Sequence, residues 1–198
     1  MQPAVHSVDE HAFSGPDLLQ GRHFYTNFGL DVRDEGGTLD LYTYGHPHRW
    51  ARILLGETMR RLWLSLGVHS DDLPRYERHL AARTVRRIAA PSETALAKSG
   101  AGGLHHSRWC MRSVGLGSFQ MAQAGFSQGW GVGRHVLGSN YFRYVCDPYD
   151  SFAEYTLDID LVELRAQWPS ANHPGEDRSK CGAVRAADFI VNHEQPAV

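Results

Sequence analysis

Cysteine is scarce in this sequence: Cys110, Cys146 and Cys181 are the only three among 198 residues. An odd number at wide spacing gives neither a disulfide framework nor the paired motif of a zinc site, and it fits a reducing cytoplasm. Long apolar runs are also missing, so no transmembrane helix is expected. Residues 1–10 lack the basic and apolar regions of a secretory signal. These absences predict a cytoplasmic protein with no membrane partner.

The chain also lacks a strong excess of charge of either sign. Twenty Lys and Arg against 22 Asp and Glu give a net charge of −2, so there is no basic field to attract nucleic acid or an anionic membrane. Hydrophobic residues make up 42% of the chain, which is enough to build a core. Histidine, in contrast, is abundant with 12 residues, and this abundance points to metal or acid–base chemistry.

The first third of the chain shows one α/β pattern. A strand around residue 12 precedes a helix over residues 19–28, which Gly29 ends. Strands are expected at 30–33, 39–44 and 52–55, with a hairpin turn at 34–37. His46 and His48 flank Pro47 in a turn, where solvent-exposed side chains are expected. The order is therefore strand, helix, strand, strand, strand (βαβββ).

The pattern starts again twice. A strand at 62–68, a helix through residue 80 and a strand at 85–88 lead into an Ala-, Gly- and Ser-rich junction. A strand at 104–110, a helix at 116–123, a Gly-rich turn at 130–135 and strands at 140–146 and 152–156 then repeat the βαβββ order. The expected division is a unit and a half over 8–90, a junction over 91–103, a full unit over 104–165 and an irregular tail over 166–198.

One block of this last unit contains several side chains that can bind a metal or transfer a proton. It runs from Gly129 through Arg134-His135 and Asn140-Tyr-Phe-Arg-Tyr144 to Glu154-Tyr155. The block resembles the C-terminal unit of the type I extradiol ring-cleaving dioxygenases, which are catechol 2,3-dioxygenase-like members of the vicinal oxygen chelate superfamily. The pair His105-His106 and the stretch His23–Leu30 resemble other parts of the same family. The implied fold is α+β, with paired βαβββ units of the glyoxalase-like type.

The resemblance implies an oxidoreductase that opens a catechol or related aromatic diol with O2. Such enzymes hold Fe(II), and sometimes Mn(II), by two His and one carboxylate. Carried over by position, His106 and Glu154 would be metal ligands, His135 the acid–base residue and Tyr144 a hydroxyl donor. Arg134 beside His135 could hold substrate charge. Strand alternation independently places Tyr144 on the same face as Asn140 and Phe142.

The chain is short for this family, which is normally built from four such units. The strand that supplies the family's first metal-ligand His is absent, as if by an internal deletion, so His11 in the first strand is the candidate third ligand. Two alternatives stay open: a catalytically inactive member of the superfamily, and a glyoxalase-like or bleomycin-resistance-like binding module. Sheet edges left unpaired by the missing strands would allow a homo-oligomer.

Overall fold

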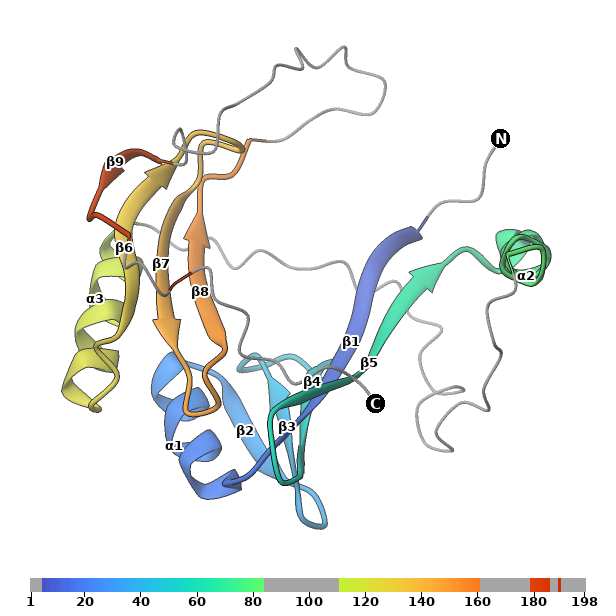
Figure 1. The fold of residues 1–198 in the computed structure, drawn as a ribbon, viewed down its shortest axis with the longest axis horizontal. Helices are drawn as coiled ribbons and strands as arrows, with labels where there is room; N and C mark the ends of the chain where they lie inside the picture. Colours follow the sequence, from blue (N-terminus) through green and yellow to red (C-terminus); the bar gives the residue numbers. More distant parts are fainter. Residues whose placement is uncertain (1–4, 84–110, 161–178, 186–188, 190–198) are drawn as a thin grey trace.

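The computed structural model describes residues 5–83, 111–160, 179–185 and 189. These residues form two β-sheets and three α-helices (Figure 1). Sheet A has the strand order β2-β3-β4-β1-β5, and sheet B has the order β8-β7-β6-β9. No helix in the described ranges is long and apolar enough to span a membrane. The elements are β1 (Val5–Gly15), α1 (Leu18–Phe28), β2 (Asp31–Asp34), β3 (Thr38–Tyr42), β4 (Arg49–Leu55), β5 (Arg60–Val68), the 3-10 turn η1 (Ser70–Asp72), α2 (Leu73–Ala81), α3 (Met111–Gln123), β6 (Gly129–His135), β7 (Tyr141–Cys146), β8 (Phe152–Leu157) and β9 (Ser179–Gly182).

The N-terminal unit confirms the predicted βαβββ order. Helix α1 begins where the carboxylate of Asp17 accepts the backbone N–H groups of Leu19 and Gln20 at 2.9 and 3.0 Å. It ends at Gly29, whose φ of 101° is a left-handed conformation that glycine adopts at low cost. Strand β1 then pairs in parallel with β4 and antiparallel with β5. Helix α1 connects β1 to β2 in the chain and packs on one face of sheet A, against β2, β3 and β4.

The C-terminal unit contains one correction. The predicted Gly-rich turn at 130–135 is wrong: these residues form strand β6, which pairs antiparallel with both β7 and β9. The glycines are present because neighbouring backbone lies too close for a side chain. A Cβ at Gly131 would stand 2.7 Å from the carbonyl oxygen of Phe142 on β7. The strands predicted at 85–88 and 104–110 fall outside the described residues.

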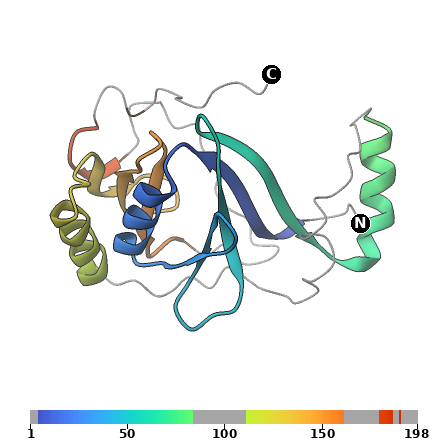
Figure 2. The same ribbon diagram turned by 90° about the horizontal axis from the view of Figure 1, so that it is seen from below.

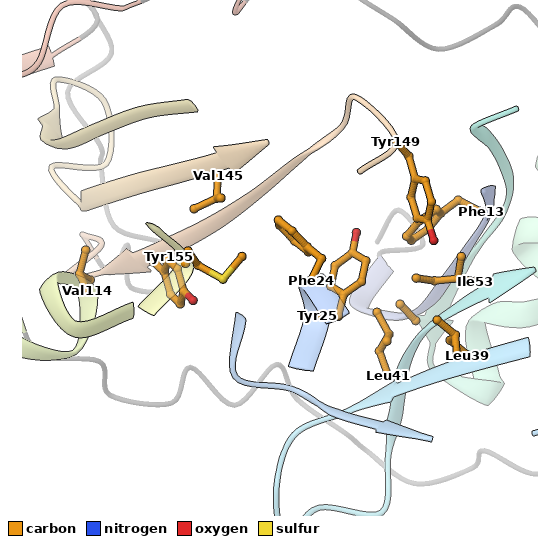
Figure 3. Close-up of a cluster of buried hydrophobic side chains, with 12 residues drawn as sticks. Phe13, Phe24, Tyr25, Leu39, Leu41, Ile53, Val114, Val145, Tyr149 and Tyr155 are labelled. Atoms are coloured by element: carbon orange, nitrogen blue, oxygen red, sulfur yellow. The ribbon is translucent and has the colours of Figure 1, made fainter. Parts of the chain in front are cut away.

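Helix α1 supplies the aromatic residues at the centre of the hydrophobic core (Figure 3). Phe24 is fully buried, and its ring meets that of Phe126 edge-on at 4.9 Å. Phe28 stacks on Tyr155 of β8 at 4.1 Å, and the Tyr155 hydroxyl donates to the Phe28 carbonyl at 2.9 Å. On the other side of α1, sheet A contributes Phe13, Leu39, Leu41 and Ile53, and α3 completes the core with Val114 and Met121.

A buried hydrogen-bond network joins α1 to the turn between β7 and β8. The hydroxyl of Tyr25 donates to Oδ2 of Asp147 at 2.7 Å, and both side chains are buried. The other oxygen of Asp147 accepts the backbone N–H groups of Tyr149 and Ser151, each at 2.9 Å. The Tyr149 hydroxyl reaches back to the carbonyl of Asp17 at 2.8 Å. These hydrogen bonds hold the first and last units together.

A second polar cluster lies on the face of sheet A that points away from α1. Asp40 accepts two hydrogen bonds from Arg52, at 2.6 and 2.8 Å, and one from Arg49 at 2.9 Å. Arg49 also donates to Glu10 at 2.5 Å, and the indole of Trp63 donates to the other Glu10 oxygen at 3.1 Å. Glu10 and Asp40 are almost completely buried. Two carboxylates and two guanidinium groups therefore compensate each other's charge here.

The two histidines of the turn before β4 correct another prediction. His48 is not solvent-exposed, because only 12% of its side chain is accessible. Its Nε2 lies 2.8 Å from the carbonyl oxygen of Asp9, and its ring packs against Trp50 at 4.2 Å. His46 is half-buried and lies 6.0 Å from the same indole. Both rings help to anchor the turn on sheet A.

We expect Tyr25→Phe to lower the free energy of unfolding by about 1–3 kcal/mol, because the change removes one donor from a buried carboxylate. Tyr44→Phe is the matched control, since Tyr44 is 70% exposed. It should change stability by less than about 0.5 kcal/mol. Urea unfolding of both variants measures the difference, and equal effects would contradict the role given to the Tyr25–Asp147 bond.

The carboxyl group of Asp40 predicts a pH dependence of stability. Burial alone would raise its pKa, but the hydrogen bonds and charges of Arg52 and Arg49 outweigh burial and hold the pKa below its usual value. A lowered native pKa stabilises the fold above the unfolded-state pKa of about 3.9, and this stabilisation is lost as pH falls through the native value.

We therefore expect the stability advantage of wild type over Asp40→Asn to shrink as pH falls from about 5 to about 3. Urea unfolding at a series of pH values tests this expectation. The exposed Glu57 provides the control substitution Glu57→Gln. An advantage that grows as pH falls would contradict the assignment.

Candidate active site

Four polar side chains meet on one face of sheet B, and three of them (His135, Tyr144 and Glu154) are site residues predicted from the sequence. Tyr144 of β7 lies directly opposite Glu154 of β8 in the strand register. His135, the last residue of β6, places its Nε2 3.2 Å from the Tyr144 hydroxyl and 3.9 Å from Oε1 of Glu154. Asn140 donates to Thr156 at 2.7 Å and lies 3.5 Å from Oε1 of Glu154. Three strands and the residue before β7 thus build one cluster.

Strand alternation separates this cluster from the hydrophobic core. Val145 and Tyr155, the immediate neighbours of Tyr144 and Glu154, point to the other face of sheet B and belong to the core (Figure 3). The predicted grouping of Asn140, Phe142 and Tyr144 on one face is consistent with these contacts. The Phe142 ring stacks on the His135 ring, with the ring centroids 4.0 Å apart, and so fixes the orientation of the imidazole.

The electrostatics of the cluster centre on Glu154. Burial raises the pKa of this carboxyl group, although the Tyr144 hydrogen bond and the His135 charge act in the opposite direction. Burial, together with the nearby Glu154 charge, also raises the pKa of the Tyr144 phenol well above its usual range. Among the described residues, no Lys or Arg forms an ion pair with Glu154. A half-buried carboxylate in these surroundings would be stabilised by a bound cation.

Aromatic rings surround the polar cluster. Trp130 of β6 stacks parallel to Tyr144 at 5.9 Å. Phe189, from the C-terminal part of the chain, meets Trp130 at 5.2 Å, Tyr144 at 5.1 Å and Phe152 at 4.5 Å. These contacts place an apolar aromatic surface directly beside His135 and Tyr144.

Sequence reasoning missed some of these residues. Trp130 was hidden because its segment reads as a turn, and Phe189 because no spacing signal in the tail marks it. Strand alternation places Asn140 on the face of Tyr144, but it does not predict Asn140 as a site residue.

The structure does not bring Arg134 into this cluster. Its Nε donates to the carbonyl of Ser139 at 2.7 Å, and its guanidinium lies over the Tyr141 ring at 4.8 Å. A long ion pair of 3.8 Å joins it to Asp158. Arg134 therefore holds the connection between β6 and β7, next to the site but on the alternate side of the strand from His135.

His11 likewise lies away from Glu154. It is exposed, and its ring stacks on Phe13 at 5.8 Å on the side of sheet A that faces α1. Glu154 instead faces away from the helices that cover sheet B. His106 is outside the described residues, and within those residues no group of three His, Cys, Asp or Glu side chains is arranged to hold a metal ion.

The residues present nevertheless fit part of a metal centre. A desolvated carboxylate with a raised pKa, bordered by an imidazole and a phenol, is a donor environment in which a divalent cation replaces a missing counter-charge. Glu154 is the carboxylate that the described residues offer here, with the Nε2 atom of His135 3.9 Å from its Oε1 atom and Tyr144 opposite it in the strand register. The arrangement combines a carboxylate with an imidazole and a phenol.

Comparison with solved structures identifies the fold. A Mn(II)-bound glyoxalase from Novosphingobium aromaticivorans superposes with a TM-score of 0.75 at 13% identity, covering 99% of this chain and 97% of that one. The 2,2',3-trihydroxybiphenyl 1,2-dioxygenase of Sphingomonas wittichii gives a TM-score of 0.73 at 13% identity and covers 92% of this chain and 100% of that one. The chain therefore has the vicinal oxygen chelate fold that glyoxalases and extradiol dioxygenases share.

Comparison of sequences is more specific. No protein-family profile matches the chain. Over 86 residues, or 42% of the chain, it is 54% identical to metapyrocatechase 2 of Cupriavidus necator, and this match spans 27% of that relative's length. Metapyrocatechase is a catechol 2,3-dioxygenase. The resemblance to the type I extradiol dioxygenases is thus confirmed.

The close contact between β6 and its neighbours generates a prediction about the site. A Cβ at Gly133 would stand 2.6 Å from the Phe142 ring, which supports His135, and 2.8 Å from the Cys181 carbonyl. We expect Gly133→Ala to destabilise the protein by about 1–3 kcal/mol through overpacking. A Cβ built at Gly115 on α3 would have no atom within 4 Å, so Gly115 provides the control.

Gly115→Ala should have the opposite sign and stabilise the protein by about 0.5–1 kcal/mol, because alanine favours a helix. Thermal and urea unfolding measure both changes. Tolerance of Gly133→Ala without loss of stability would show that β6 does not lie this close to β7 and β9.

Proposed function

We propose that this protein is an extradiol dioxygenase that opens the ring of a catechol or related aromatic diol with O2. The observation that carries the proposal is the contact of His135 with Tyr144 and Glu154 on one face of sheet B. The sequence identity to a metapyrocatechase supports it. The match spans only 27% of that relative's length, so the identity of the diol is not carried over from it.

Glu154 and His106 are the proposed metal ligands. Glu154 offers a half-buried carboxylate with a raised pKa, and the resemblance to the family implies His106 as a second ligand. Fe(II) is the proposed metal, and Mn(II) accepts the same oxygen and nitrogen donors. When bound, the metal would supply Lewis acidity and the redox chemistry with O2. His11 faces the helix side of sheet A, so we do not assign it as the third ligand.

His135 is the proposed acid–base residue. Imidazole exchanges protons readily near neutral pH, and a diol must lose a proton from its hydroxyl before the ring can be attacked. The Nε2 atom points toward the Tyr144 hydroxyl at 3.2 Å, so a substrate hydroxyl in this space would meet both groups. Stacking of His135 on Phe142 fixes the plane of the ring and the direction in which Nε2 can accept a proton.

Tyr144 and the aromatic rings have positioning roles in this proposal. The raised pKa keeps the Tyr144 phenol protonated, so it can donate a hydrogen bond to a negatively charged oxygen of the diol. Trp130 and Phe189 pack against each other, and Trp130 stacks parallel to Tyr144, which restricts how the Tyr144 ring can move. An aromatic ring of the substrate placed against this cluster would gain apolar contact while its oxygens face His135 and Tyr144.

Metal binding and turnover separate the proposed roles. After anaerobic loading with Fe(II), Glu154→Ala should lose the metal. His135→Ala should keep the metal and lose turnover by ~10²–10⁴-fold, as expected for removal of a general base. Metal per chain is quantified by elemental analysis, and turnover is followed by the absorbance of the yellow ring-cleavage product of catechol.

The exposed histidine of α2 provides a matched control, because His79→Ala should retain both metal and turnover. Equal loss of metal in the His135 and Glu154 variants would contradict the division of roles. A folded wild-type protein that binds Fe(II) without turning over catechol would indicate an inactive relative, whereas failure to bind Fe(II) would contradict the metal centre itself.

A further inference from the structure

Strand β5 forms an open edge of sheet A. Among the described strands it pairs only with β1, so the backbone groups along its other side have no strand partner there. Residues 60–68 contain no proline or lysine, the residues that commonly prevent a strand edge from pairing with another chain. The helix that follows leads away from the sheet, since α2 lies beyond the end of β5 in both views (Figures 1 and 2).

The same strand exposes an apolar stripe. Leu62, Leu64 and Leu66 alternate along β5 and are 43%, 51% and 45% exposed. Val8 on β1, opposite Leu66 in the register, extends the stripe and is 37% exposed. The intervening Trp63 and Ser65 side chains are instead hydrogen-bonded to Glu10 and Asp9. An open edge that carries exposed leucines is a surface suited to association.

The charges at the two ends of β5 indicate which orientation a partner strand would take. Arg60 and Arg61 are exposed at the beginning of the strand, and Asp71 and Asp72 follow just after its end. Two copies of β5 running in parallel would place arginines against arginines. Two antiparallel copies would place the arginine end of each strand beside the aspartate end of the other, which is a favourable arrangement.

We propose that β5 is the dimerisation strand of this protein and that its partner is β5 of a second copy. The two strands pair antiparallel about a two-fold axis near Leu64. Leu64 then faces Leu64 of the partner subunit, and Leu62 faces Leu66 of the partner subunit. Such an isologous interface is self-complementary and closed, because each edge covers the other. Sheet A of one protomer then continues into sheet A of its partner.

Self-association of the full chain tests the proposal, measured by sedimentation over a range of protein concentrations. Leu64→Lys places two like charges opposite each other at the axis and should weaken the dimer by about tenfold or more. Leu116→Lys is the matched control, since Leu116 on α3 is 57% exposed and far from β5 in the fold. It should leave the dimer intact. A monomeric wild-type protein, or a dimer that Leu64→Lys does not weaken, would overturn the proposal.

Two further variants test the register and the charges. Leu64→Cys should form a disulfide between protomers on oxidation, because the axis brings the two copies of this position together, and mass mapping distinguishes it from links through the native cysteines. Arg61→Glu should weaken the dimer, and adding Asp71→Arg should restore it. A disulfide-linked dimer that forms equally well through Leu116→Cys would contradict the assigned interface. Protection of the β5 amides from hydrogen exchange in a monomer would show instead that the chain covers its own edge.

Discussion

The packing of α1 between two sheets is the constraint on which the rest of the structure depends. Sheet A meets this helix through Phe13 and Leu39, and sheet B meets it through Tyr155. The aromatic residues of α1 pack against both sheets, so the two sheets share one hydrophobic core. The buried Tyr25–Asp147 hydrogen bond adds a directional contact to this packing. One helix therefore sets the relation between residues that lie more than 120 positions apart in the chain.

The candidate site is a consequence of strand pairing in sheet B. Tyr144 and Glu154 are near each other because β7 and β8 pair in a register that makes them opposite residues. His135 joins them because the closely packed glycines of β6 let this strand lie against β7. The chemistry thus depends on backbone hydrogen bonds and on the absence of side chains at three glycines as much as on the polar residues themselves.

Much of this arrangement could be predicted from the sequence. Alternation of apolar residues gave β3 and β7, and Asp17 with Gly29 marked the ends of α1 because capping depends on local chemistry. The strand β6 could not be predicted, since its glycines are explained only by the distance to β7 and not by any local preference. For the same reason Phe189 could not be assigned: its contacts with Trp130 and Tyr144 come from tertiary packing alone. The residues that the family motif covers, His135, Tyr144 and Glu154, lie together in the structure, whereas His11, chosen without a motif, lies on the helix side of sheet A.

Strand β8 serves the site and the core with adjacent residues. Glu154 faces His135, while Tyr155 stacks on Phe28 and donates to its carbonyl. Inserting or deleting a single residue in β8 would exchange these two directions, leaving a carboxylate in the aromatic core and a large ring in the site. Changes in chain length during evolution can therefore be accommodated in the turns on either side of β8, but not within the strand. The spacing between Tyr144 and Glu154 is fixed by the core as firmly as by the chemistry.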